Sequence, residues 1–401
     1  MEIQVPSYFL CPISLQVMRD PVTLITGITY DRESIERWMF SEKHWTCPVT
    51  RQALPETEPI TPNHTLRRLI QAWCTVNASA GVERFPTPRP PVNKMEIMKI
   101  LEDAKKPQNL MECLRRLRMI VSDCERNRRC VEESGAVEFL GSIVTKSRGG
   151  GGQEDEVCDE AIYILHCIQI SEQGLIKLIS TSNGGLIESL TVVMRRTSNY
   201  ESRVHAILLL KSLVEVIAPA RLMAVQEEVF REVVKVLDEN VSCKATKAAL
   251  KIIGELCPWG RNRIKAVKAG AVPVLIELLL EEPGKRECEM ILVVLDLLCG
   301  CAEGRAEVVG HAAGIAVVAK KVLRVSQAAT DRAVRILYLI SKYTAMPVVI
   351  QEMLQVGAVT KLCLVLQVDC GMKTKEKAME MLRVHSRVWR NSPCIAYPLI
   401  S

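Results

Sequence analysis

Aromatic side chains are scarce in this chain: phenylalanine, tryptophan and tyrosine make up 4% of its 401 residues. Hydrophobic residues nevertheless reach 48%, so the core must be mostly aliphatic, as in a large helical protein. No hydrophobic run reaches the roughly 18 residues that a membrane-spanning helix needs. The formal net charge of +6 is small for this length and argues for no more than a mild preference for acidic surfaces.

The start of the chain also lacks the basic and apolar regions of a secretory signal. We therefore expect a cytoplasmic protein, with nuclear or peripheral plasma-membrane pools as alternatives. Sixteen cysteines are present, but beyond residue 80 they are scattered, without the paired spacing of metal ligands. In a protein of this class such cysteines are usually small buried hydrophobic residues.

Composition divides the chain near residue 80. The segment Phe85–Pro91 holds four prolines in six positions, which forbid helix and favour a stiff, extended spacer. We predict a first domain over residues 5–80, a proline-rich linker over 81–94, a helical solenoid over 95–390 and a C-terminal tail over 391–401.

The first domain has the pattern of a small α/β fold. Two β-prone stretches flank Gly27, which indicates a hairpin. Asp31 is placed to cap a helix, and Asn63 to cap a second one. The apolar faces that we predict for these helices comprise Ile35, Trp38 and Met39 in the first, and Leu66, Leu69, Ile70 and Trp73 in the second.

The rest of the chain is a repeat, in which a small residue precedes an aliphatic helix, as in residues 269–279. Aligned copies at positions 185, 227, 270, 313 and 357 are separated by 42, 43, 43 and 44 residues. The step from 135 to 185 is longer, and we assign residues 148–156 there to a flexible insertion between helices. A period near 43 residues predicts an armadillo or HEAT solenoid. The fold class is therefore mostly α, with the small α/β domain preceding an all-α superhelix.

Two tetrapeptides in the first domain carry the chemistry: Cys11-Pro12-Ile13-Ser14 and Cys47-Pro48-Val49-Thr50. A structural zinc site built from Cys-x-x-Cys pairs would need cysteine where Ser14 and Thr50 stand. Either the resemblance to a zinc site is accidental, or this is a zinc-free version of such a domain held by hydrogen bonds and packing. A zinc-binding signalling scaffold is a further alternative, which Ser14 and Thr50 oppose. Another alternative, a His44–Cys47 nucleophile pair, has no signal for an oxyanion hole or for a third residue.

These motifs together resemble a U-box. The resemblance covers residues 5 to 78 with the motifs in order: residues 9–14, 18–22, 27–32, 35–38, 47–50 and 62–70. A U-box followed by an armadillo array is similar to the plant U-box armadillo ubiquitin ligases, and the whole chain resembles their immune and stress-signalling subgroup.

The resemblance implies a RING-type ubiquitin transferase that binds a ubiquitin-loaded conjugating enzyme. It would promote transfer of ubiquitin to lysines of a substrate recruited by the armadillo repeats and mark that substrate for proteasomal degradation in plant immune or stress signalling. No covalent enzyme–ubiquitin intermediate, cofactor or metal is implied. The alternative is a non-catalytic armadillo adaptor or scaffold.

The resemblance also assigns residues. The conjugating enzyme would contact Ile13, Leu15, Trp38, Pro48, Val49 and Arg51. Structural roles fall to Cys11, Asp20, Asp31, Arg32 and Cys47, with polar contacts of the charged residues in place of a metal.

Further partners follow from the solenoid and from the family. Protein substrates are expected in the armadillo groove, and basic clusters such as Lys244, Lys247 and Lys251 would suit an acidic segment or acidic lipids at a membrane. Nucleic acid is not expected, because aromatic residues for base stacking are sparse. U-boxes often pair, so a homodimer is one alternative for an oligomeric state that the sequence leaves open. Thr61-Pro62 and Thr87-Pro88 fit an upstream proline-directed kinase.

Overall fold

A computed structural model describes residues 5–41, 44–55, 60–77, 92–147, 152–182, 185–196, 199–240, 242–344 and 346–390. The chain divides into two compact units, residues 1–136 and 137–401. The predicted linker lies almost entirely outside the described residues, as does the predicted C-terminal tail. The boundaries of the predicted domains therefore remain predictions.

The N-terminal domain contains a three-stranded antiparallel sheet in the order β2-β1-β3. Strand β1 (Pro21–Thr23) pairs with β2 (Thr29–Asp31) on one side and with β3 (Thr61–Pro62) on the other. The predicted hairpin is confirmed, and Gly27 provides its positive φ of 76°. A short 3-10 helix, η1 (Ser7–Phe9), precedes the sheet.

Two helices complete this domain. Helix α1 (Arg32–Glu36) continues into a π-helical turn, η2 (Arg37–Ser41), and α2 (His64–Val76) follows the sheet. The Asn63 cap is confirmed, since its side chain accepts a hydrogen bond from the amide of Leu66 at 3.0 Å. The prediction that Asp31 caps α1 with its side chain is wrong, because that carboxylate binds the loop before β1 instead.

The core of the N-terminal domain is small and mixed. Its buried side chains include Tyr30, Ile35, Met39, Cys47 and Ile70. Leu69, which we predicted on the apolar face of α2, is 52% exposed, so that prediction is wrong. The next residue, Ile70, is buried. Successive side chains on an α-helix differ in direction by about 100°, so Leu69 points away from the core that Ile70 enters.

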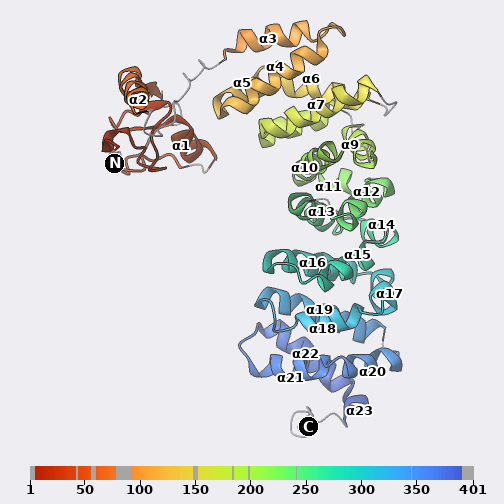
Figure 1. The fold of residues 1–401 in the computed structure, drawn as a ribbon. Coiled ribbons are helices and arrows are strands. Elements are labelled where there is room, and N and C mark those ends of the chain that lie inside the picture. Colours follow the sequence, from red (N-terminus) through yellow and green to blue (C-terminus); the bar gives the residue numbers. More distant parts are fainter. Residues whose placement is uncertain are drawn as a thin grey trace. The chain divides into compact units, whose positions relative to one another are not determined.

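Helices form the described remainder of the chain (Figure 1). In the first unit these are α3 (Lys94–Asp103), α4 (Leu110–Asp123) and α5 (Glu125–Glu133). From the unit boundary onward they are α6 (Ala136–Lys146), α7 (Gln153–Ile168), α8 (Glu172–Thr181), α9 (Gly185–Arg195), α10 (Tyr200–Val216), α11 (Pro219–Met223), α12 (Glu227–Asp238), α13 (Cys243–Leu256), α14 (Asn262–Lys268), α15 (Ala271–Leu280), α16 (Lys285–Leu298), α17 (Ala302–Gly310), α18 (Gly314–Lys321), α19 (Gln327–Tyr343), α20 (Pro347–Gln355), α21 (Ala358–Gln367), α22 (Met372–Val384) and α23 (Ser386–Trp389).

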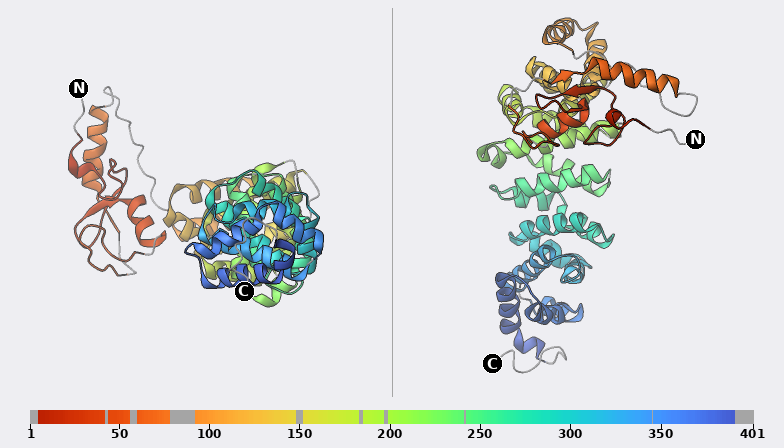
Figure 2. Two further views of the ribbon diagram at one scale, coloured as in Figure 1. Left: turned by 90° about the horizontal axis from the view of Figure 1, so that it is seen from below. Right: turned by 90° about the vertical axis from the view of Figure 1, so that its left-hand side faces the viewer.

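The second unit repeats three helices: a short first helix, a second helix and a longer third one. In its described part, five such repeats run from α8 to α22. The third helices α7, α10, α13, α16, α19 and α22 each pack against the next, and we call them the third-helix layer (Figures 1 and 2). The second helices α9, α12, α15, α18 and α21 form a parallel series in the same way. The predicted solenoid is confirmed.

Glycine marks the junction between first and second helices at the predicted phase. Gly270 and Gly357 precede α15 and α21 with φ of 85° and 76°, in the left-handed region that favours glycine. The predicted insertion is shorter than residues 148–156, because Gln153 already begins α7. The three acidic residues of its first turn stabilise the helix N-terminus, which explains the difference.

No single helix among the described residues is long and apolar enough to cross a membrane. Helices α20 and α21 pass that test only as a pair bent by 68°. Their apolar residues Ile350, Val359 and Leu362 are buried in the solenoid, which accounts for their composition.

Candidate functional site

The first Cys-Pro loop is a tight, hydrogen-bonded turn. The amide of Leu15 donates to the carbonyl oxygen of Cys11 at 2.8 Å, and the amide of Cys11 donates to the carbonyl oxygen of Gln16, also at 2.8 Å. Leu15 has a φ of 56° and a side chain that is 73% exposed. The loop therefore holds an apolar side chain in solvent on a constrained backbone.

The second Cys-Pro loop has the same geometry. Arg51 donates its amide to the carbonyl oxygen of Cys47 at 2.8 Å, and Cys47 donates to that of Gln52 at 2.8 Å. Arg51 has a φ of 59°, close to that of Leu15. The two loops are thus structural equivalents, with an exposed leucine at the end of one and an exposed arginine at the end of the other.

The hydroxyl groups that stand at the predicted zinc-ligand positions serve the backbone. Ser14 Oγ accepts from the amide of Gln16, and Thr50 Oγ1 from the amide of Gln52, each at 3.5 Å. Such short-range bonds are typical of serine and threonine in turns. Among the described residues, no three His, Cys, Asp or Glu side chains lie together as a metal site would require.

Hydrogen bonds to sulfur take the place that metal coordination would have. Cys47 Sγ lies 3.0 Å from Tyr30 Oη, and it accepts from Thr26 Oγ1 at 3.4 Å and from the Thr50 amide at 3.5 Å. Burial raises the pKa of the Cys47 thiol, but the bonds from Thr26, Thr50 and Tyr30 outweigh it and lower the pKa to about 6. Burial and the nearby sulfur in turn raise the pKa of Tyr30.

Cys11 is the counterpart in the first loop. Its sulfur accepts from the amide of Asp31 at 3.3 Å, which ties the loop to the end of β2. Burial raises the pKa of this thiol, but backbone amides of Ser14, Asp31 and Ile13 more than compensate and leave the pKa lowered. Both cysteines are essentially buried, at 0% and 1% exposure. The structure therefore gives no support to Cys47 as a nucleophile, because its sulfur is inaccessible to a thioester.

Trp38 connects the central helical turn to the second loop. Its indole N–H donates to the carbonyl oxygen of Thr46 at 2.8 Å, and its ring lies 4.4 Å from the ring of His44. The side chain is half-buried, so one edge is fixed while part of the ring remains accessible.

The six residues assigned to conjugating-enzyme binding fall into two groups by exposure. Ile13, Trp38 and Pro48 are half-buried, and Ile13 and Trp38 pack against the core of the domain. Leu15, Val49 and Arg51 are exposed at the loop ends, and Val49 is 52% exposed. An apolar surface held on a rigid backbone, with a cation beside it, suits a protein partner.

A charged network joins the sheet to both helices. Arg32 Nε lies 2.6 Å from Asp20 Oδ2, and its guanidinium lies 3.6 Å from Glu36. Asp31 accepts the amides of Arg19 at 2.8 Å and Asp20 at 2.9 Å. Burial raises the pKa of Asp31, against the effect of these two amides. The side chains predicted to replace a metal therefore lie together around one loop.

The sequence did not single out Tyr30 and Thr26 as partners of Cys47. Their signal was weak: alternation along β2 places Tyr30 on the core side, but nothing local indicates a sulfur partner. Thr26 lies in the hairpin turn, and its contact with residue 47 joins segments separated by 21 residues.

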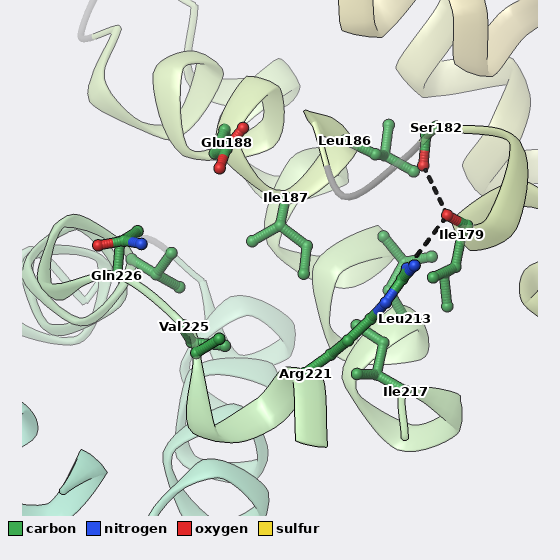
Figure 3. Close-up of a pocket in the computed structure, with 12 residues that line it drawn as sticks. Ile179, Ser182, Leu186, Ile187, Glu188, Leu213, Ile217, Arg221, Val225 and Gln226 are labelled. Atoms are coloured by element: carbon green, nitrogen blue, oxygen red, sulfur yellow. Dashed lines mark hydrogen bonds between the residues drawn. The ribbon is translucent and has the colours of Figure 1, made fainter. Parts of the chain in front are cut away.

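A separate pocket of about 290 Å³ lies in the armadillo unit, among helices α8 to α12 (Figure 3). Its walls include the apolar side chains of Leu186, Ile187, Leu213 and Ile217. At its edge the Arg221 guanidinium donates to the carbonyl oxygen of Ile179 at 3.4 Å.

Comparison with known proteins agrees with this geometry. The U-box domain family matches residues 5–79, and the family described as the plant U-box protein ARM repeat region matches residues 96–400. The chain is 54% identical to the Arabidopsis thaliana E3 ubiquitin-protein ligase PUB23, over 100% of this chain and 97% of that protein. It is 49% identical to Arabidopsis thaliana PUB22, also an E3 ubiquitin-protein ligase, over 98% of this chain and 97% of that protein.

A solved structure supports the fold alone. It comes from work on a phosphorylation switch in the interaction between cadherin and beta-catenin, with a TM-score of 0.64 at 12% identity. The match covers 84% of this chain and 63% of the chain in that structure. The two family matches and the Arabidopsis relatives show that the chain belongs to the plant U-box armadillo-repeat proteins and is a ubiquitin ligase of the RING type.

Proposed function

We propose that the U-box positions a ubiquitin-loaded conjugating enzyme while the armadillo repeats hold the substrate, whose modified lysines mark it for proteasomal degradation in plant immune or stress signalling. The observation that supports the binding of a conjugating enzyme by the U-box is the structural equivalence of the two Cys-Pro loops. Each fixes its backbone with the same pair of 2.8 Å hydrogen bonds and leaves the residue with positive φ, Leu15 or Arg51, exposed to solvent.

Such a surface acts by positioning. The buried sulfur of Cys47 cannot accept ubiquitin. In the proposed mechanism the thioester stays on the conjugating enzyme, and the substrate lysine attacks it directly. Restricting two reactants to one geometry removes part of the entropic cost of a bimolecular step. In this proposal the exposed Arg51 guanidinium donates to carbonyl oxygens of the enzyme–ubiquitin conjugate.

The test is substrate-independent ubiquitin chain formation with a panel of plant conjugating enzymes. Arg51→Ala should lower the rate about tenfold by removing a charge-assisted hydrogen bond. Arg37→Ala is the matched control, because Arg37 is also an exposed arginine of the U-box but pairs with Glu33 on the helix at 3.0 Å. No chain formation with any enzyme, by a folded chain, would favour the non-catalytic adaptor.

A second copy of the chain is a further proposed partner. Leu69 and Val76 are 52% and 76% exposed on α2, with the half-buried Trp73 between them. Tyr8, 63% exposed, continues this strip through the ring of Phe9. Light scattering should show a dimer that Leu69→Glu with Val76→Glu converts to monomers; a monomeric parent chain contradicts the proposal.

Regulation and location are proposed on narrower grounds. Thr61 is exposed in β3, three residues before α2, and is accessible to a proline-directed kinase. Thr87 lies outside the described residues. We place the protein in the cytoplasm, with peripheral membrane contact through basic side chains as a secondary location. Phosphopeptide mapping and fractionation of stimulated cells test these proposals.

A further inference from the structure

One buried carboxylate in the third-helix layer holds two exposed arginines. Asp296 on α16 has a side chain with 0% exposure. Its Oδ2 lies 3.0 Å from Arg332 Nη1, and its Oδ1 lies 3.2 Å from Arg335 Nε, both on α19. The arginine side chains remain 41% and 48% exposed, so part of each stays accessible to a partner on the same helix.

Arg195, 55% exposed and 3.2 Å from the buried Glu232, shows the same arrangement with one arginine, but two other arginines of this unit differ. Arg196, which binds Asp155 and Asp159, is 13% exposed, and Arg203, which binds Glu239, is 5% exposed. Those guanidiniums are buried along with their bonds, as in an ion pair that only joins helices. At Asp296 the carboxylate is buried, while the side chains of Arg332 and Arg335 are partly exposed to solvent.

The charge of this cluster is unbalanced. A single carboxylate faces two guanidiniums, and the charge of Lys377 on the neighbouring α22 also acts on Asp296. Burying a carboxylate is costly unless it is paired, which favours keeping both arginines beside it. Arg332 donates a hydrogen bond to Asp296 Oδ2, whereas Arg335 lies at ion-pair distance from Oδ1 without a hydrogen bond. Two neighbouring, partly exposed guanidiniums suit carboxylate groups, which arginine binds in a bidentate geometry.

Further along the same layer, α13 displays three exposed lysines, Lys244, Lys247 and Lys251, at helical spacing. Lys251 lies 3.5 Å from Glu215, whereas Lys244 and Lys247 have no ion-pair partner among the described residues. Excess positive charge therefore occurs at two places on one face, with α16 between them.

We propose that the third-helix layer binds an acidic segment of a protein substrate, and that Arg332 and Arg335, held by Asp296, are its main anchors. The inference rests on the proposed function, because it names the chemistry of the substrate that the armadillo repeats recruit. Carboxylates spaced along an extended chain would meet the arginine pair and the α13 lysines in turn.

The test uses the full chain and a fluorescein-labelled peptide in which glutamates alternate with glycines, at near-physiological salt. The double change Arg332→Lys, Arg335→Lys keeps the charge but removes the planar guanidinium groups that bind a carboxylate with two hydrogen bonds. It should weaken binding about fivefold. The neutral triple change Asp296→Asn, Arg332→Gln, Arg335→Gln removes the anchors without leaving a buried charge unpaired, and should weaken binding at least tenfold.

The matched control is a similar triad at the C-terminal ends of the second helices α15 and α18. Lys320 and Arg324 share Glu282 at 2.8 and 3.6 Å, but Glu282 is 56% exposed. Changing all three to glutamine alters the net charge by the same amount and should leave binding within twofold. Thermal unfolding of each variant identifies any that fail to fold.

The proposal is overturned if the Asp296 triple variant binds like the control. It is also overturned if the unmodified protein does not bind the peptide, or binds only vesicles that contain phosphatidylserine. Ubiquitin chain formation by the unmodified protein is measured separately. Its absence contradicts the proposed function, whereas intact chain formation without peptide binding contradicts this inference alone.

Discussion

The indole N–H of Trp38 donates to the carbonyl oxygen of Thr46 at 2.8 Å. This bond joins the helical turn after α1 to the strand-like segment that enters the second Cys-Pro loop. The tryptophan ring is consequently fixed beside the loop rather than buried in the core. The bond therefore assigns Trp38 two roles: it supports the loop, and it presents part of its ring to a partner.

Trp38→Phe should separate these two roles. Phenylalanine keeps an aromatic face but leaves the Thr46 carbonyl without its donor, at a cost of about 1 kcal/mol in the free energy of unfolding. Ubiquitin chain formation should fall several-fold, and Trp38→Ala should abolish it. Equal activity of Trp38→Phe and the parent chain would show that the hydrogen bond is irrelevant to the loop.

The Cys47 thiolate should make stability depend on pH. Its pKa in the folded protein is about 6, below the ordinary value near 8.5, so the unfolded chain binds more protons between these values. The free energy of unfolding should therefore increase by up to about 3 kcal/mol as the pH is raised from 6 to 8.5. This added stability should disappear as the pH is lowered through 6.

Thermal unfolding of the full chain, followed by tryptophan fluorescence across this range, checks the expectation. Cys47→Ser keeps a hydrogen-bond acceptor of similar shape but stays neutral, so its profile should be flatter. Cys74→Ser is the control, because Cys74 is buried in the same domain and burial raises its pKa. Parallel profiles for the parent and Cys47→Ser would contradict a thiolate at this position.

The buried ion pair of Arg32 with Asp20 should matter more than the exposed pair of Arg37 with Glu33. Asp20→Asn leaves a 9% exposed guanidinium short of its carboxylate and should lower the free energy of unfolding by about 2 kcal/mol. Glu33→Gln breaks a pair whose side chains are 64% and 80% exposed and should cost less than about 0.5 kcal/mol. Denaturant unfolding of both variants compares them; similar losses would contradict the structural role of Asp20.

Two helical glycines of the solenoid should respond oppositely to alanine. A Cβ at Gly314 would lie 2.0 Å from the carbonyl oxygen of Val308, so the backbone must move. Gly314→Ala should therefore destabilise the second unit by about 2 kcal/mol or more. A Cβ at Gly254 in α13 meets nothing within 4 Å, and Gly254→Ala should stabilise by up to about 1 kcal/mol. Melting temperatures decide the sign of each change.

The sequence predicted periodic features well and specific contacts poorly. The steps between glycine-led segments predicted the solenoid, because Gly270 and Gly357 mark a turn that each repeat must make. The cap at Asn63 was predictable because it depends on the next three residues alone. Asp31 had the same local signal, yet its carboxylate binds amides 11 and 12 residues away.

In the candidate site, too, the sequence predicted the local motifs but not the contacts between distant residues. The Cys-Pro motifs indicated two related loops, but not that Leu15 and Arg51 share one left-handed backbone conformation. The Asp296 cluster was missed because its members lie on different helices and are 36 and 39 residues apart in the sequence. Contacts between repeats have no signal in the local spacing of charges.

The central claim is that a metal-free pair of loops presents Ile13 and Pro48, on either side of Trp38, to a conjugating enzyme. The most direct measurement is ubiquitin chain formation by the full chain, with and without a zinc chelator, compared with Ile13→Ala. We predict equal rates with and without chelator for the parent chain and a loss of at least tenfold in the variant, whose apolar contact is removed. Inhibition by the chelator, or full activity of a folded Ile13→Ala protein, would contradict this account.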